Sequence, residues 1–199
     1  MKKIFLNTCI SFLKKYHEYT PKDIKKLEYG LEGLYLTLTK LIIILFCSLI
    51  LGIFKEVVLV LLFFNIIRYT GFGFHAEKSS ECLLCSLINF LLIPLFFLKV
   101  RLPMAYIIGI CILCLISYLL FAPADTVKRP LPNKKKRMIR KVFTLIIGTL
   151  YITAIIIFNN PYITALLISS LIVESIMISP ITYKIFRQPY NNYKSAIRA

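Results

Sequence analysis

Acidic residues are scarce in this sequence. Its 199 residues include 9 Asp and Glu against 25 Lys and Arg, which gives a formal net charge of +16 at pH 7. So basic a chain often binds nucleic acid. Here, however, the basic residues are gathered into separate segments between apolar runs, as the positive-inside rule of membrane proteins explains. We therefore expect no nucleic-acid partner.

Charged residues of either sign are also few. They make up 17% of the chain, whereas 58% of the residues are hydrophobic and the mean hydropathy is +0.77. An ordinary soluble domain is about 45–50% apolar. A soluble core of this size cannot hide so much apolar surface, but lipid can accept it. We predict a single all-α integral membrane domain.

Histidine and glycine are rare, with two and seven residues respectively. One histidine, His75, and two glycines, Gly71 and Gly73, fall within one polar stretch, residues 68–82, between apolar runs. The six cysteines lie mostly inside apolar runs, so a disulfide framework of the secreted type is not expected. The polar stretch is where we expect a site.

Apolar runs of membrane length predict six spans. A helix of about 20 apolar residues crosses the hydrocarbon layer. The second run is short, because its dense apolar part covers only residues 57–67, so a re-entrant or broken helix is an alternative there. The predicted spans are residues 34–54, 57–74, 82–98, 103–122, 142–158 and 162–180.

Residues 1–33 are basic and amphipathic, and Pro21 divides them into two predicted helices. Apolar residues recur at three- and four-residue steps, which is typical of helices that lie on a membrane surface. Thr20 is the expected cap of the second helix. The alternative is a basic lead-in that only fixes topology.

The distribution of charge supports six crossings. Residues 1–34 carry seven Lys and Arg, residues 126–141 carry eight and the tail, residues 181–199, carries four. The predicted outer turns hold only Lys55, Lys99 and Arg101. Six spans place the three basic segments on one side, so both termini, the loop 123–141 and the tail 181–199 are predicted to be cytoplasmic.

Cys82 is the candidate nucleophile of the polar stretch. Ser79 and Ser80 favour a helix start, which places Cys82 in the first turn, where the helix dipole favours a thiolate. His75 is the candidate general base. In one continuous helix, seven residues span about 10.5 Å, too far for a hydrogen bond, so the chain must turn between them.

Metal binding is the competing interpretation of the cysteines. Cys82 and Cys85 form one CxxC pair, and Cys111 and Cys114 form another. Both pairs lie in apolar helices, whereas zinc-binding pairs usually sit in polar turns. Buried thiols that pack as small hydrophobes are the simpler account, and no metal or cofactor is expected.

Two motifs resemble those of the accessory gene regulator B (AgrB) family. The first comprises Arg68, then Gly73-Phe74-His75-Ala76, then Ser79-Ser80 and Cys82. The second is Ala122-Pro123-Ala124-Asp125-Thr126, followed by Lys128-Arg129-Pro130. Length, hydropathy and the six-span pattern are similar as well. The resemblance covers essentially the whole chain.

This resemblance implies a membrane-embedded cysteine endopeptidase of Gram-positive quorum sensing. Its substrate is an amphipathic propeptide of the AgrD type, cleaved at the cytoplasmic face of the cell membrane. By likeness to the family, Cys82 attacks the scissile carbonyl, and a Cys or Ser of the propeptide then takes over the acyl group. A thiolactone or lactone ring results. A homodimer is a further expectation carried over from the family.

Other residues have two interpretations each. Asp125 or Glu77 is a candidate third catalytic member that orients the imidazole, or serves a loop or cap. Arg68 binds a substrate carboxylate or fixes the loop with Gly73, Ser79 and Ser80, or it simply ends a span. The cluster 134–137 attracts an acidic propeptide tail or only sets topology.

Two non-catalytic functions remain as alternatives. A peptide transporter or exporter would use the same polar break as a substrate site at membrane depth. An assembly or scaffold protein would tolerate substitution of both Cys82 and His75. Thiol reactivity distinguishes these classes, because only an enzyme requires Cys82 to react faster than the other cysteines.

Overall fold

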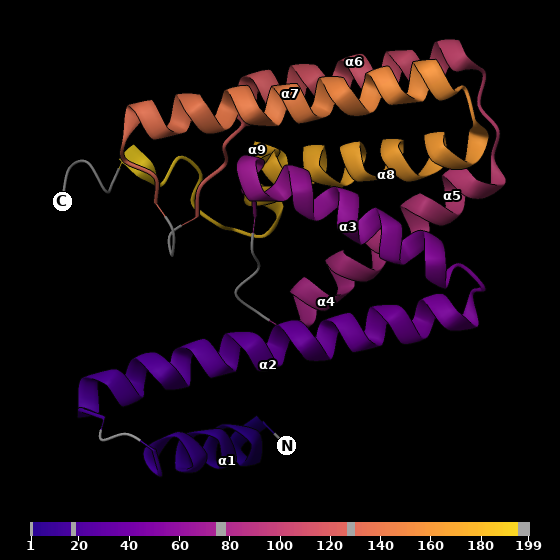
Figure 1. Cartoon of the computed structure of the whole chain (residues 1–199). Helices are drawn as coiled ribbons and strands as arrows, with labels where there is room; N and C mark the ends of the chain where they lie inside the picture. The colour runs from indigo at the N-terminus through magenta and orange to yellow at the C-terminus, as the bar shows by residue number, and fades with distance from the viewer. Residues whose placement is uncertain (1, 17–18, 75–78, 127–129, 195–199) are drawn as a thin grey trace. The chain divides into compact units, whose positions relative to one another are not determined.

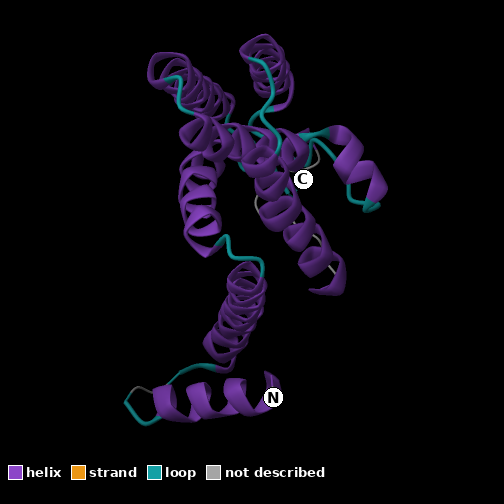
Figure 2. Cartoon of the chain, turned by 90° about the vertical axis from the view of Figure 1, so that its right-hand side faces the viewer, coloured by secondary structure: helices purple, strands orange, loops and turns teal. Residues whose placement is uncertain are grey.

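The computed structural model describes residues 2–16, 19–74, 79–126 and 130–194. These residues form helices joined by short loops, and among them there is no β-strand beyond one isolated bridge between Phe72 and Ala124 (Figure 2). This confirms the predicted all-α class. The chain divides into two compact units, Met1–Cys47 and Ser48–Ala199.

The first unit contains α1 (Lys2–Lys14) and most of α2 (Pro21–Ile50). The hydroxyl of Thr20 accepts a hydrogen bond from the Asp23 N–H at 3.3 Å and donates one to the Asp23 carboxylate at 2.6 Å, so the predicted cap is present. α2 continues for 30 residues. The predicted interfacial helix and the predicted span 34–54 therefore form one helix over most of this stretch, because no proline separates them.

The second unit is built around α8 (Pro161–Ile178), which contacts α3 (Phe54–Gly71), α5 (Ile93–Lys99), α6 (Met104–Phe121) and α7 (Lys134–Phe158) (Figure 1). α8 is buried around nearly its whole circumference, as expected for a helix that is apolar on every side. The hydroxyls of its two buried serines donate to carbonyls four residues earlier, from Ser169 to Ala165 and from Ser170 to Leu166.

A tight turn joins α7 to α8. Asn159 adopts the left-handed conformation at φ 42°, and Asn160 caps α8 by accepting bonds from the Tyr162 and Ile163 N–H groups. α7 begins at Lys134, eight residues before the predicted span, because the Asn133 side chain accepts from the Lys136 N–H at 3.1 Å. Much of the predicted basic loop is therefore helical.

The third predicted span is one nearly continuous helix with a π-helical turn. It comprises α4 (Ser79–Leu87), the turn η1 (Ile88–Leu92) and α5. Pro94, near the start of α5, cannot donate a backbone hydrogen bond, and its ring crowds the carbonyl four residues earlier. A wider turn at this point accommodates the ring without ending the helix.

Five helices in the described part of the chain are long and apolar enough to cross a membrane. α3 is not among them; its 18 residues include Lys55, Glu56 and Arg68. Even so, the Tyr162 hydroxyl at the start of α8 donates to Glu56 at 3.4 Å, and the Phe74 N–H, just beyond α3, donates to the Met177 carbonyl at 2.7 Å. α3 thus extends from one end of α8 to the other.

Large apolar side chains cover the outer faces of these helices. In α6, Ile112 is 52% exposed and Leu113 is 66% exposed, while Cys111 and Cys114 are buried. An apolar surface of this extent is unfavourable in water and suits contact with lipid chains. The second unit thus exposes apolar side chains on its outer surface, as a polytopic membrane protein does.

The buried hydroxyl of Tyr118 provides a test of this packing. It donates to the Leu171 carbonyl at 2.7 Å and so ties α6 to α8. Tyr118→Phe should lower the free energy of unfolding by about 1 kcal/mol, the usual net worth of such a bond. Denaturant titration in detergent measures this. Tyr106→Phe, at a 67% exposed position of the same helix, is the matched control and should have no effect. Equal stability of the two variants would contradict this role.

Candidate functional site

The segment Phe72–Phe74 is bonded to two distant parts of the chain. The Gly73 N–H donates to the Ala124 carbonyl at 2.7 Å, and the Ala124 N–H donates to the Gly71 carbonyl at 2.9 Å. The Phe74 N–H donates to the Met177 carbonyl at 2.7 Å. The two motifs singled out in the sequence therefore meet at the end of α8.

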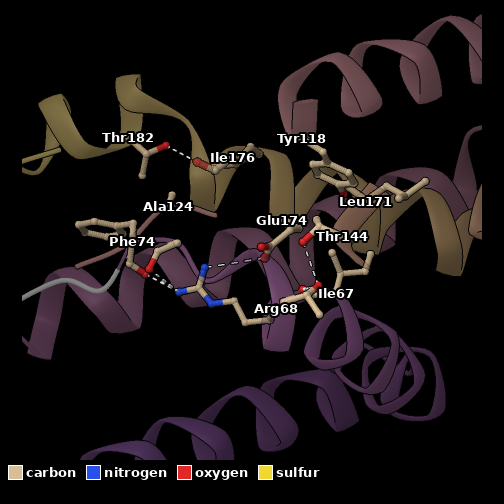
Figure 3. Close-up of polar contacts among 12 residues, drawn as sticks. Ile67, Arg68, Phe74, Tyr118, Ala124, Thr144, Leu171, Glu174, Ile176 and Thr182 are labelled. Carbon is tan, nitrogen blue, oxygen red and sulfur yellow. Dashed lines mark hydrogen bonds and ion pairs between the residues drawn. The ribbon is translucent and has the colours of Figure 1, made fainter. Parts of the chain in front are cut away.

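Arg68 holds the same segment from the other side. Its Nη2 donates to the carbonyls of Gly73 at 3.1 Å and Phe74 at 2.6 Å. Its Nη1 lies 3.8 Å from Oε2 of Glu174. Figure 3 shows the guanidinium between the Phe74 carbonyl and the Glu174 carboxylate. A planar group with several donors in a fixed fork suits this double contact.

Two glycines make room for this arrangement. A Cβ at Gly71 would collide with the Glu174 carboxylate, and a Cβ at Gly73 would collide with Arg68 Nη1 and approach the Met177 carbonyl oxygen to 2.8 Å. Gly73 also has φ +114°, which side-chain-bearing residues rarely adopt. The close approach of backbone to guanidinium therefore depends on glycine.

Glu174 belongs to this cluster but is not among the site residues predicted from the sequence. It is fully buried in α8, and neither carboxylate oxygen accepts a hydrogen bond from the described residues. The available signal was a lone acidic residue inside an apolar run, since ionisable residues in membrane spans are costly and usually functional. Nothing in the local sequence indicated that its partner would be Arg68.

Asp125, a candidate imidazole-orienting residue, is 2% exposed and lies in the loop after α6. Its Oδ2 accepts from the Leu131 N–H at 3.2 Å and lies 3.6 Å from Arg137 Nη1. The Arg137 guanidinium stacks 3.6 Å from the centroid of the Tyr193 ring. These contacts fold the loop back toward the start of α7.

Tyr183, in α9 (Pro180–Ile185), packs edge-on against the Phe74 ring, and its hydroxyl supports the same loop. It donates to the carbonyls of Ala124 and Asp125, each at 3.2 Å. Burial raises the pKa of the Tyr183 hydroxyl well above its ordinary value. The group thus stays protonated and remains a donor.

Cys82 is the fourth residue of α4, within its first turn. Its side chain is half-buried, and the Ser80 side chain is exposed. The Cys82 thiol interacts electrostatically with the Cys85 thiol. The Cys85 thiol, one turn further along the helix, also interacts electrostatically with the Arg68 guanidinium. Unpaired N–H groups and the helix dipole favour an anion in the first turn of a helix, where Cys82 lies.

His75 and Glu77, the predicted base and one candidate orienting residue, lie outside the described residues, as does the side chain of Ser79. The described chain fixes the two boundaries of that segment. On one side is Phe74, bonded to Arg68 and Met177. On the other side α4 begins at Ser79.

The residues that the structure describes contain no cluster of metal ligands. No three His, Cys, Asp or Glu side chains come close enough there to hold an ion. The Cys82–Cys85 pair lies in α4, and the buried pair Cys111 and Cys114 lies in α6.

An open apolar groove of about 820 Å³ runs between α3 and α7. Arg140, one turn before this groove in α7, donates from Nη1 to the Tyr69 carbonyl at 2.8 Å and lies 4.4 Å from the centroid of the Phe72 ring. The groove thus has an apolar lining and a basic residue, Arg140, next to one of its ends. The groove is lined by Leu62, Asn65, Ile66, Tyr69, Thr70, Phe143 and Ile147.

These features define an all-helical, polytopic membrane protein whose polar residues converge where α3, α6 and α8 end. The sequence profile of the family described as accessory gene regulator B matches residues 6–178. The chain belongs to this family, which confirms the resemblance found in the sequence.

Two groups of bacterial relatives are similar over most of their length. An AgrB-like protein of Listeria monocytogenes serotype 4a is 35% identical over 171 residues, covering 85% of this chain and 83% of the relative. Accessory gene regulator protein B of Staphylococcus aureus strain JH9 is 26% identical over 173 residues, covering 87% and 91%. No solved structure matches significantly. Family membership supports a role in agr quorum-sensing peptide maturation, with links to the AgrD propeptide and the membrane.

Gly73→Ala tests the close approach of Arg68 to the backbone. The added Cβ meets Arg68 and the Met177 carbonyl and also strains the positive φ, so we expect a loss of about 1–3 kcal/mol in unfolding free energy. Thermal unfolding in detergent measures it. Gly109→Ala in α6, where nothing lies within 4 Å, is the control and should be neutral or slightly stabilising. A tolerated Gly73→Ala would mean that the cluster is loosely packed.

Proposed function

We propose that this protein is a membrane-embedded cysteine endopeptidase that cleaves an AgrD-like propeptide and helps to close its (thio)lactone ring. One observation carries the proposal: Cys82 lies in the first turn of α4, and Arg68 holds the carbonyl of Phe74, the last described residue before His75. A half-buried thiol at a helix start suits nucleophilic chemistry.

The first step is attack of the Cys82 thiolate on the scissile carbonyl of the propeptide. His75 acts as general base toward the thiol and then as general acid toward the leaving amine. The amide C–N bond breaks, a thioester forms and the C-terminal tail of the propeptide departs with the proton. Asp125 and Glu77 are the candidates for orienting the imidazole. Ser79 and Ser80 open the helix that presents the thiol.

The second step transfers the acyl group within the substrate. A Cys or Ser of the propeptide attacks the thioester, which regenerates Cys82 and closes the ring. A thioester exchanges with a second thiol at little change in bond energy, and a nearby thiol has the advantage of an intramolecular reactant over water. An apolar boundary around the site helps to exclude competing hydrolysis.

The groove between α3 and α7 is the proposed docking place for the amphipathic part of the propeptide. Its apolar floor suits the apolar face of a helix, as in other helix-in-groove complexes. Basic residues at the start of α7, together with Arg140, complement the acidic tail expected of the substrate. Because basic segments belong on the inner face, the site is proposed to face the cytoplasm, with both termini on that side.

Substitution of the two catalytic candidates tests the reaction. Cys82→Ala and His75→Ala should abolish propeptide cleavage, with a loss of at least about 100-fold for the histidine, since general-base catalysis contributes that much. Cys82→Ser should retain a trace of activity. Cleavage is followed by mass spectrometry in proteoliposomes. Cys85→Ala, one turn further along the helix, is the matched control and should cleave normally.

Thiol reactivity separates an enzyme from a peptide transporter or scaffold. At neutral pH, iodoacetamide should label Cys82 faster than Cys85, Cys111 or Cys114, and His75→Ala should remove that difference. Equal labelling rates, or processing that survives Cys82→Ala, would rule out the peptidase.

Filling the groove tests substrate docking separately from chemistry. Ile66→Trp adds bulk at a lining position and should raise KM by about tenfold while kcat stays constant, because only binding is obstructed. Ile112→Trp, on the exposed face of α6 outside the groove, is the matched control. An unchanged KM for Ile66→Trp would mean that lipid, and not the propeptide, occupies the groove.

A further inference from the structure

We propose that Glu174 is a positioning residue for the Cys82–His75 chemistry, acting through Arg68 on the backbone that leads into His75. The inference rests on the proposed peptidase function and adds to it a residue outside both family-like sequence motifs. Its basis is the contact of the Glu174 carboxylate with Arg68, whose other nitrogen holds the Gly73 and Phe74 carbonyls.

The burial of Glu174 calls for a reason beyond stability. The carboxylate is 0% exposed, lies in an apolar helix and accepts no hydrogen bond from the described residues. Apolar residues of similar volume often replace a buried ion pair without loss of stability. A carboxyl group that only filled space here would be unfavourable, so we attribute its presence to its contact with Arg68.

That neighbour is the Arg68 guanidinium, which is constrained on both sides. Nη2 is directed at two carbonyl oxygens, while Nη1 lacks a hydrogen-bond partner among the described residues and faces Glu174 at 3.8 Å. Gly71 gives the carboxylate its space, and Gly73 gives Nη1 its space. Without Glu174, the half-buried guanidinium would lose its neighbour at Nη1 and would favour solvent or an acidic substrate over these carbonyls.

The contact with Phe74 carries the effect toward the catalytic candidate. Its carbonyl belongs to the peptide unit that joins Phe74 to His75, and a peptide unit is planar. The oxygen is held 2.6 Å from Nη2, and the Phe74 N–H is bonded to Met177, so both polar groups of the last described residue before His75 are fixed. Through Arg68, Glu174 thereby helps to position the residue that precedes the proposed base, His75. It does so without contact with the substrate.

A double-mutant cycle tests this chain of contacts. Glu174→Gln should lower kcat for propeptide cleavage by about tenfold, a part of what general-base catalysis provides, and leave KM unchanged. Labelling of Cys82 by iodoacetamide should slow in the same variant. Arg68→Gln should slow cleavage more, and the double variant should be no slower than Arg68→Gln alone, because Glu174 acts only through Arg68.

Glu56→Gln is the matched control. Glu56 lies in the same helix as Arg68, 12 residues away, or about 18 Å along the axis, and this variant should behave as wild type. All rates are expressed per folded molecule, with folding followed by gel filtration and thermal unfolding in detergent. The double variant has neither the carboxyl group nor the guanidinium, so no unpaired charge is left inside the protein. We therefore expect the double variant to fold even if a single variant does not.

The outcomes separate this inference from the peptidase proposal. Wild-type kcat per folded molecule in Glu174→Gln, a raised KM with unchanged kcat, or a double variant whose loss equals the product of the single losses would each overturn the positioning role. If Cys82→Ala is inactive at the same time, the peptidase stands without Glu174. If Cys82→Ala still cleaves, both proposals fall.

Discussion

The hydrogen bonds from the Arg68 guanidinium to the Gly73 and Phe74 carbonyls are the contact on which the polar end of the second unit depends. A membrane interior offers no water to backbone groups outside helices, so each must find a partner within the protein. Arg68 satisfies the Gly73 and Phe74 carbonyls, while Ala124 and Met177 accept the N–H groups of the same two residues. Irregular backbone can therefore exist at the end of the bundle.

α8 makes this arrangement possible because it is surrounded by protein. A lipid-facing helix could not carry Glu174, since an ion in hydrocarbon is far more costly than one beside an opposite charge. The small side chains of Ser169 and Ser170 allow close approach, and Ser170 also donates to the Val60 carbonyl of α3 at 3.3 Å. The most buried helix thus provides both the packing surface and the counter-ion.

The sequence predicted single helices well and long-range pairs poorly. Apolar runs located the membrane helices, and Thr20 and Ser79 marked helix starts, because these signals are local. The start of α7 at Lys134 was missed, since its lysines suggested a loop while Asn133 caps a helix. The Arg68–Glu174 contact and the hydrogen bond between Gly73 and Ala124 join residues far apart in the chain. The spacing of apolar residues predicts each helix separately. It gives no information on which residues of different helices come into contact.

The proposed position of the nucleophile agrees with the chemistry of helices in lipid. Within a span every N–H is already bonded to a carbonyl, so only the first turn offers free donors to an anion. A thiolate nucleophile in such a protein is therefore best stabilised at a helix start, and Cys82 is the fourth residue of α4. In the proposed peptidase, the base His75 belongs to the segment that precedes α4. The described chain before that segment ends at Phe74, whose carbonyl Arg68 holds.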